Sequence, residues 1–209
     1  MQLEGLIPIQ VKDKTFETLM SVYQVALNQV VEELEQIKLG MNRIYGYEII
    51  NHITSRIKTP DSIVKKMKKK NYKLNYQNLV YNINDIAGVR AICPTKSNIE
   101  SLVSIINQLP NMKVIKEKDY ITKPKESGYS GYHLIVEVPI QVEGKTLPVK
   151  VEIQLRTMAM DFWATNEHKV KYKTNKKISN LDSRKMVLYA KILNFIDKKI
   201  SHIYQKQFE

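Results

Sequence analysis

One stretch decides the fold: Val151-Glu152-Ile153-Gln154-Leu155-Arg156. Its polar and apolar residues alternate strictly, and alternate side chains of a β-strand point to opposite faces of a sheet. We therefore expect the three apolar side chains in a core, with Glu152, Gln154 and Arg156 sharing the other face. A carboxylate, an amide and a guanidinium in one row predict the floor of a polar site. The alternative is the solvent-exposed face of an amphipathic strand.

The strand belongs to a predicted hairpin, with arms at 132–140 and 147–157 around Glu143-Gly144. Outward from the hairpin the chain alternates between short strands and helices. This mixture predicts an α+β fold, a mixed, mostly antiparallel sheet flanked by helices. Further strands are expected at 52–58, 88–93 and 113–121, and helices at 61–70, 97–109 and 158–172.

Long helices are expected at both ends of the chain, at 13–39 and 182–205. In the first, apolar residues recur at three- and four-residue steps, with Asp13 as N-cap and Gly40 after its end. In the second, Leu188, Ile192 and Phe195 lie along one side. The helix at 97–109 opens with a capping-box pattern, Ser97-Asn-Ile-Glu100. We expect one domain over 1–209, with a core at 49–173 and terminal helices for oligomerisation.

Composition narrows the class of protein. The formal charge is +12, from 33 Lys and Arg against 21 Asp and Glu, which favours anionic partners such as nucleotides or nucleic acid. A single cysteine, Cys93, excludes an intramolecular disulfide and a cysteine-based zinc site, and its apolar neighbours predict a buried thiol. The sequence has no secretory signal and no apolar run long enough to span a membrane. These features predict a cytoplasmic protein without membrane contact.

Two carboxylates stand out in this basic chain. Glu152 lies on the polar face of its strand, and Asp85 precedes the buried strand at 88–93. Carboxylates from different strands could share one Mg²⁺, which binds one or two carboxylates together with substrate phosphates. The alternative for Asp85 is a helix or turn cap.

Basic residues cluster near one strand and the helix that follows it. Arg56 and Lys58 share a strand face, and Ser62, Lys65 and Lys66 lie on the helix at 61–70. The start of a helix favours phosphate oxygens, so this cluster predicts a phosphate site. The alternative is an ordinary solvated face, which we expect for 68–70.

The polar loop at 120–133 contains residues suited to a nucleotide. Gly128 allows close backbone approach, Lys125 offers charge, and Tyr129 offers a ring for stacking a base. His133 follows, although a lone histidine is more often structural than catalytic. Each of these signals is weak by itself.

The order of the motifs resembles the synthetase domain of the RelA/SpoT family, over 49–173. The short length is similar to the stand-alone small alarmone synthetases of the RelQ type. The matching motifs are Arg56-x-Lys58-x-x-x-Ser62-x-x-x-Lys66, Asp85-Ile-Ala-Gly-Val-Arg90, Asp119-Tyr-Ile-x-x-Pro-Lys125-x-x-Gly-Tyr129-x-x-x-His133, Val151-Glu-Ile-Gln-Leu-Arg-Thr157 and Glu167-His168-Lys169.

The resemblance implies transfer of the β,γ-pyrophosphate of ATP to the 3′-hydroxyl of GDP, GTP or GMP, with Mg²⁺ as cofactor. Asp85 and Glu152 match the Mg²⁺ carboxylates, and Glu152 also matches the base for the acceptor hydroxyl. Tyr129 matches the ring that stacks on guanine. The residues expected around ATP are Arg56 and Arg90 on the adenine, Lys58, Ser62, Lys65 and Lys66 at the phosphates, and His168 near the donor. Those expected to face the acceptor nucleotide are Lys118, Lys125, Gly128, His133 and Gln154.

One motif departs from the family pattern. The family often has Gly-Tyr-Arg-Ser where this chain has Gly128-Tyr129-Ser130-Gly131. An arginine near the acceptor is missing, which leaves the preference among GMP, GDP and GTP open. No His-Asp pair of the family's hydrolase domain is present, so we expect synthesis without breakdown.

Two other functions stay open. The first is a relative that pyrophosphorylates the 3′ end of tRNA, which suits the charge of +12. The second is an inactive synthetase-like module that binds nucleotides or RNA.

Relatives of the RelQ type form homotetramers through terminal helices, so we expect that assembly, with an alarmone or single-stranded RNA as an allosteric partner. The lysines for RNA are Lys68, Lys69, Lys70, Lys173, Lys176 and Lys177, whose alternative role is solubility.

Overall fold

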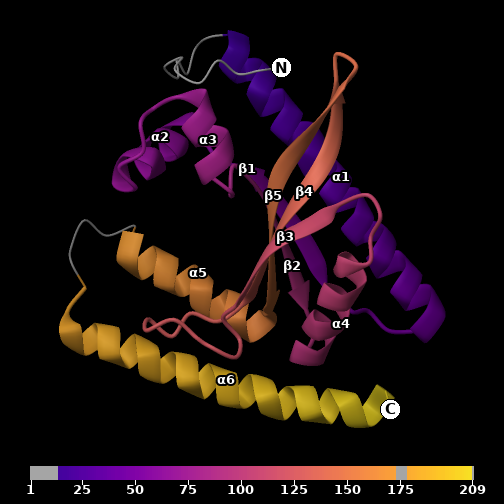
Figure 1. Ribbon diagram of the computed structural model, residues 1–209. Coiled ribbons are helices and arrows are strands. Elements are labelled where there is room, and N and C mark those ends of the chain that lie inside the picture. Colours follow the sequence, from indigo (N-terminus) through magenta and orange to yellow (C-terminus); the bar gives the residue numbers. More distant parts are fainter. Residues whose placement is uncertain (1–13, 173–177, 209) are drawn as a thin grey trace.

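The computed structural model describes residues 14–172 and 178–208. Helices and strands alternate along these residues, with long helices first and last (Figure 1). The helices are α1 (Lys14–Tyr45), α2 (Pro60–Lys69), α3 (Tyr76–Asn82), α4 (Lys96–Asn107), α5 (Met158–Tyr172) and α6 (Asn180–Phe208). The strands are β1 (His52–Ile57), β2 (Ala87–Cys93), β3 (Lys113–Asp119), β4 (Tyr132–Val142) and β5 (Lys145–Thr157).

The five strands form one mixed sheet in the order β1-β2-β5-β4-β3. Only the β2–β5 pair is parallel among the pairings of the described residues, and the other three are antiparallel. The predicted α+β class with a mixed, mostly antiparallel sheet is therefore confirmed. The β5 strand lies between β2 and β4, so its polar row is supported from both sides.

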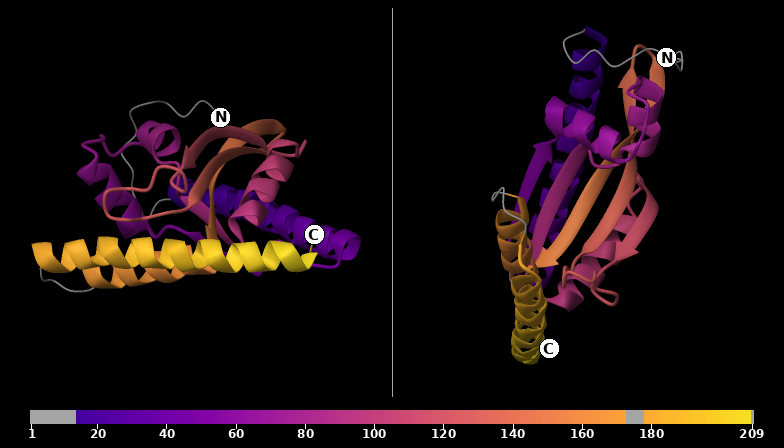
Figure 2. Two further views of the ribbon diagram at one scale, coloured as in Figure 1. Left: turned by 90° about the horizontal axis from the view of Figure 1, so that it is seen from below. Right: turned by 90° about the vertical axis from the view of Figure 1, so that its left-hand side faces the viewer.

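The main core lies on one face of the sheet, beneath α1 and α4 (Figure 2). Val151, Ile153 and Leu155 enter it fully buried, as the alternation of β5 predicted. The periodic apolar residues of α1 pack against the same face, and burial of such side chains contributes about 25 cal/mol per Å² of apolar surface. Cys93 is buried in this core, as expected, and burial raises the pKa of its thiol to about 12.

The β4–β5 hairpin turns at Glu143 and Gly144, as predicted. Both residues have positive φ, 48° and 74°, the backbone of the tight turn whose twist matches that of hairpin strands. The arms pair up to Val142 and Lys145. They are thus longer than the expected segments, because the pairing continues to the turn itself.

Several element boundaries differ from the sequence prediction. α1 continues through Gly40 to Tyr45, because its packing against the sheet outweighs the cost of one glycine. Thr95, not Ser97, caps α4: its Oγ1 accepts from the Asn98 N–H at 3.2 Å. The short helix α3, capped by Asn75, was not predicted. The expected N-cap Asp13 lies outside the described residues.

α6 lies along α5 and passes below α4 (Figure 1). Its inward side, with Ala190, Leu193 and the buried Asp197, faces the domain. The side that carries Leu188, Ile192 and Phe195 is exposed. No helix within the described ranges is long and apolar enough to cross a membrane.

Candidate active site

The polar row of β5 lies on the sheet face opposite α1. Strand pairing places Gly88 of β2 beside Glu152, and His133 of β4 beside Gln154. Arg56 of β1 pairs with Gly88 on the far side. A cleft of about 210 Å³ opens above Glu152 and Gln154, two of the three residues of the predicted floor, whereas Arg156 does not line it. Its walls consist of Thr54, Ser55, Arg56, Asp85, Gly88, Val89, Arg90, Glu152 and Gln154.

Asp85 lies at the edge of the cleft between two lysines. Lys58 donates to its Oδ2 at 2.8 Å, and Lys66 pairs with its Oδ1 at 2.7 Å. Burial opposes ionisation of this carboxyl, but the hydrogen bonds and charges of both lysines outweigh it and lower its pKa. The structure thus brings the expected metal carboxylate and two expected phosphate ligands together.

The other expected phosphate ligands lie on α2. The helix begins with Thr59 as N-cap and Pro60 in its first turn, and proline suits that position because the first helical N–H has no partner within the helix. Ser62 lies in the first turn of α2, where its hydroxyl accepts a hydrogen bond from the hydroxyl of Thr59 at 2.8 Å. Lys65 is exposed on the same helix.

Glu152 is held by two side chains of the sheet. His133 Nδ1 lies 3.1 Å from its Oε1, and Gln154 Nε2 donates to its Oε2 at 2.7 Å. Burial raises the pKa of this carboxyl, but hydrogen bonding and the charge of His133 outweigh it, so the pKa is lowered. A carboxylate held ionised in a cleft is suited to accept a proton or to bind a cation.

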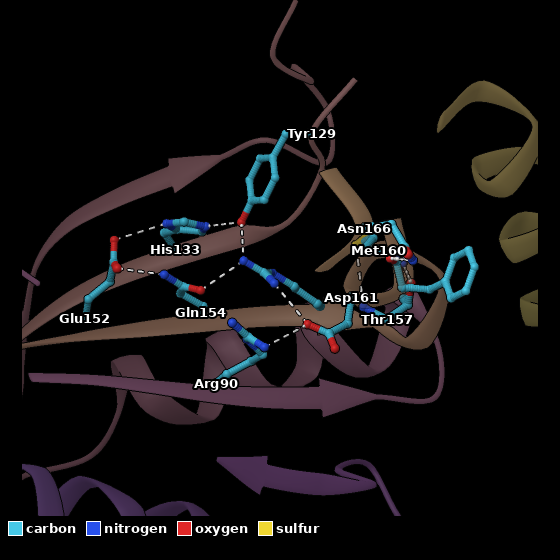
Figure 3. Close-up of polar contacts among 11 residues, drawn as sticks. Arg90, Tyr129, His133, Glu152, Gln154, Thr157, Met160, Asp161 and Asn166 are labelled. Atoms are coloured by element: carbon cyan, nitrogen blue, oxygen red, sulfur yellow. Dashed lines mark hydrogen bonds and ion pairs between the residues drawn. The ribbon is translucent and has the colours of Figure 1, made fainter. Parts of the chain in front are cut away.

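These contacts continue into a closed ring of hydrogen bonds (Figure 3). From Glu152 the ring passes through His133 to the Tyr129 hydroxyl, 2.5 Å from His133 Nε2. Arg156 Nη2 donates to that hydroxyl at 3.0 Å and to Gln154 Oε1 at 3.0 Å, and Gln154 returns to Glu152. An ionised carboxylate only accepts, so the contact between His133 and Glu152 is a donation from the Nδ1–H of His133.

One residue that the sequence analysis did not expect in the site, Asp161, completes the network. Asp161 of α5 pairs with Arg156 at 2.9 Å and with Arg90 at 3.2 Å (Figure 3). The alternation of β5 places Arg156 in the row, but nothing in the sequence marks Asp161 as its partner. Asp161 contacts Arg90 only because the start of α5 folds back toward β2.

Tyr129 lies differently from the simple expectation of an open stacking ring. Its side chain is buried, at 8% exposure, and packs edge-to-face against Trp163 and Tyr120. The Lys125 ammonium lies 4.7 Å from its ring centroid. The Lys125 ammonium therefore occupies ring surface on which a base would otherwise stack.

The rest of the acceptor loop surrounds Lys125. Gly128 has φ of 90° and donates its N–H to the Lys125 carbonyl at 2.7 Å, which closes the turn. Lys118 lies on β3 opposite His133. Partial burial, and then the charge of Lys118, lower the pKa of the Lys125 ammonium. The expected acceptor residues are thus neighbours, with two cations close together.

Some predicted residues do not line the cleft. His168 is exposed near the end of α5. Lys68, Lys69 and Lys70 are exposed at the end of α2 and the residue after it, as expected of a solvated face. The three other lysines assigned to RNA (Lys173, Lys176 and Lys177) lie outside the described residues.

Comparison with known proteins identifies the family. The profile of the region found in RelA / SpoT proteins matches residues 55–177. That match covers more than half of the chain and contains the whole polar row. The chain belongs to the RelA/SpoT family.

Two individual relatives of this RelA/SpoT chain support the same family assignment. It is 38% identical to the GTP pyrophosphokinase YwaC of Bacillus subtilis over 179 residues, 86% of this chain and 85% of the relative. It is 33% identical to the GTP pyrophosphokinase YjbM of the same organism over 91% of this chain and 89% of the relative. Both relatives match along most of their length.

Solved structures match equally broadly. Small alarmone synthetase 1 from Bacillus subtilis, bound to its product pppGpp, superposes with a TM-score of 0.86 at 30% identity. The match covers 94% of this RelA/SpoT chain and all of that one. Small alarmone synthetase 2 from the same organism gives 0.83 at 36% identity, over 92% of this chain. The α+β fold, with its long terminal helices, is that of the small alarmone synthetases.

Proposed function

We propose that this protein transfers the β,γ-pyrophosphate of ATP to the ribose 3′-hydroxyl of a guanosine nucleotide and releases AMP. One observation carries the proposal. A single cleft contains Asp85, Glu152 and the two arginines Arg56 and Arg90, in a chain closely similar to GTP pyrophosphokinases. A pure binding module has little need for both carboxylates.

The donor is assigned to the side of the cleft with Arg56 and Arg90. Both guanidinium groups line the cleft, and arginine can stack on an adenine ring. Lys58 and Lys66, now paired with Asp85, are suited to hold phosphate oxygens as point charges. Ser62 and Lys65 lie on α2, the helix that begins beside Lys58. His168 does not line the cleft, and we propose that it lies near the bound donor, ATP.

Glu152 is the proposed base. Its lowered pKa keeps it ionised at neutral pH, and the N–H of His133 fixes one oxygen. Glu152 takes the proton of the 3′-hydroxyl as that oxygen bonds to the β-phosphorus of ATP. The bond from the β-phosphorus to the α–β bridging oxygen breaks, and AMP leaves. Positioning and charge neutralisation account for most of the rate in such transfers.

A divalent metal fits this cleft, and Mg²⁺ is the proposed ion. No group of three or more metal-ligating side chains exists within residues 14–172 and 178–208. Asp85 and Glu152 nevertheless line one cleft, and the charge of Asp85 acts to raise the pKa of Glu152. Two carboxylates completed by substrate phosphates are a common Mg²⁺ site. When bound, the ion would neutralise charge that develops on the phosphates.

We assign the acceptor nucleotide to the part of the sheet face near Tyr129. The residues proposed to face it are Lys118, Lys125, Gly128, His133 and Gln154.

The test of the proposed function is incubation with ATP, Mg²⁺ and one acceptor at a time: GMP, GDP, GTP or tRNA. We expect label from the β-phosphate of ATP to appear on a free guanosine nucleotide. Label on tRNA alone would support the first rival, and label on no acceptor the binding module.

Assembly through α6 is also proposed, as a homotetramer. The outward side of α6 exposes Leu188, Ile192 and Phe195, and contiguous exposed apolar residues commonly mark a protein interface. We expect Ile192→Glu with Phe195→Glu to reduce the molar mass in sedimentation, because two carboxylates would be buried. Lys145→Glu, at the exposed tip of the β4–β5 hairpin and far from α6 (Figure 1), should leave the mass unchanged. An unchanged mass in the double variant would remove α6 from the interface.

RNA as a partner, an allosteric alarmone and a cytoplasmic location stay predictions. For RNA, the described lysines are Lys68, Lys69 and Lys70, all exposed. An RNA contact that neutralises Z phosphates weakens with a log–log salt slope of about −0.7Z. Changing the six assigned lysines to Gln should flatten that slope. An unchanged slope, or no binding at low salt, would mean that the lysines only solvate the surface.

A further inference from the structure

One carboxylate of α5, that of Asp161, contacts Arg156 at the end of the polar row and Arg90 of the neighbouring strand β2. Oδ1 of Asp161 lies 2.9 Å from Arg156 Nη1 and 3.2 Å from Arg90 Nη1 (Figure 3). Arg90 lines the cleft, whereas Arg156 does not. The same oxygen atom therefore connects a cleft residue with a buried one.

Arg156 continues the connection to the acceptor loop. Its side chain is only 7% exposed, and its Nη2 donates both to the Tyr129 hydroxyl and to Gln154. A planar guanidinium can hold these partners together because its donors form a rigid fork. The contacts thus run from Arg90 through Asp161 and Arg156 to the Tyr129 hydroxyl.

We propose that Asp161 and Arg156 are positioning residues that couple the two nucleotide sites, so that ATP in the donor site increases the affinity of the acceptor site. The proposal rests on the proposed function for the assignment of Arg90 to ATP and of Tyr129 to the guanosine nucleotide. Neither Asp161 nor Arg156 needs to touch a substrate.

The direction of the coupling follows from exposure. The Arg90 side chain is 33% exposed and that of Arg156 is 7% exposed, so Arg90 has more conformational freedom to lose. A base stacked on Arg90 restricts it and, through Asp161, restricts Arg156 and the Tyr129 hydroxyl. The second nucleotide then meets a loop that is already ordered, and it loses less conformational entropy on binding.

The test measures GDP binding by calorimetry with and without the non-reacting donor analogue AMPCPP, in the presence of Mg²⁺. For the wild type we expect AMPCPP to lower the Kd for GDP by about fivefold or more, the lower end of common coupling factors. Asp161→Asn removes the shared charge, and Arg156→Lys cannot reach all three partners. In each variant the coupling factor should fall below about twofold, the level at which two sites act almost independently.

Asp197→Asn is the matched control. Asp197 is a buried carboxylate on α6 that accepts from Thr157 at the end of β5 and pairs with Lys96. Its polar contacts within the described residues include none with Arg90, Tyr129, Arg156 or Asp161. It should keep the wild-type coupling factor. The double variant Arg156→Gln with Asp161→Asn removes both charges, so it leaves no uncompensated buried ion if a single variant fails to fold.

The outcomes separate the two proposals. If AMPCPP or GDP does not bind to the wild type, the proposed function fails. If both bind but the wild-type coupling factor is below about twofold, the coupling proposal alone is wrong. It is also wrong if a folded Asp161 or Arg156 variant keeps the wild-type factor, or if Asp197→Asn loses it.

Discussion

Glu152→Gln is expected to lower kcat by about 10²–10³-fold, the usual cost of removing one group that acts on developing charge. The amide keeps the size of the side chain and can still accept from His133, but it cannot take the proton of the 3′-hydroxyl. Steady-state AMP release at saturating ATP and GDP measures the loss. Asp85→Asn should give a loss of similar size, since the proposed metal site would lose one of its two carboxylates.

The matched control for Glu152 is Glu137→Gln. Glu137 pairs across the sheet with Lys150 of β5, two residues from Glu152, and it does not line the cleft. It should keep wild-type turnover. All three variants should retain the wild-type circular dichroism spectrum. Near-wild-type turnover in Glu152→Gln or in Asp85→Asn would exclude that residue from the mechanism.

Arg56→Ala and Tyr129→Ala are each expected to raise the KM for a different substrate. A stacked base is worth about 1–3 kcal/mol in nucleic-acid sites, so each variant should raise one KM by roughly 5- to 150-fold. Arg56→Ala should raise the KM for ATP, and Tyr129→Ala that for the guanosine nucleotide. The measurement is a full matrix of initial rates over both substrate concentrations.

Burial of Tyr129 calls for a companion variant. Tyr129→Phe keeps the ring against Trp163 but removes the hydroxyl contacts with His133 and Arg156. If stacking is the main role, Tyr129→Phe should raise the acceptor KM much less than Tyr129→Ala does. Equal effects of Arg56→Ala and Tyr129→Ala on both substrates would contradict the assignment of two pockets.

The row on β5 was predictable because a strand has only two faces. Once Val151, Ile153 and Leu155 are buried, Glu152, Gln154 and Arg156 must share the other face. The hairpin turn was equally local, because Glu143 and Gly144 adopt the positive φ angles that such turns require. The fold class followed from these strands and from the periodicity of the helices.

The contacts between elements were not predictable in the same way. Asp161 reaches Arg90 only through the angle at which α5 leaves β5, and no spacing in the sequence encodes that angle. The burial of Tyr129 depends on Trp163 and on α6, which follow much later in the chain. Asp85 drew attention through its position before β2, but its two lysine partners come from β1–α2 through tertiary packing.

The most direct test of the central claim is to follow the label from ATP that carries a radioactive β-phosphate, with GDP and Mg²⁺. Pyrophosphate transfer predicts unlabelled AMP and a labelled guanosine nucleotide in equal amounts, with the label on the ribose 3′ position. Glu152→Gln should form both products far more slowly, and still in equal amounts. Labelled ADP as the product, or a label on the 5′ phosphates of the guanosine nucleotide, would contradict the account.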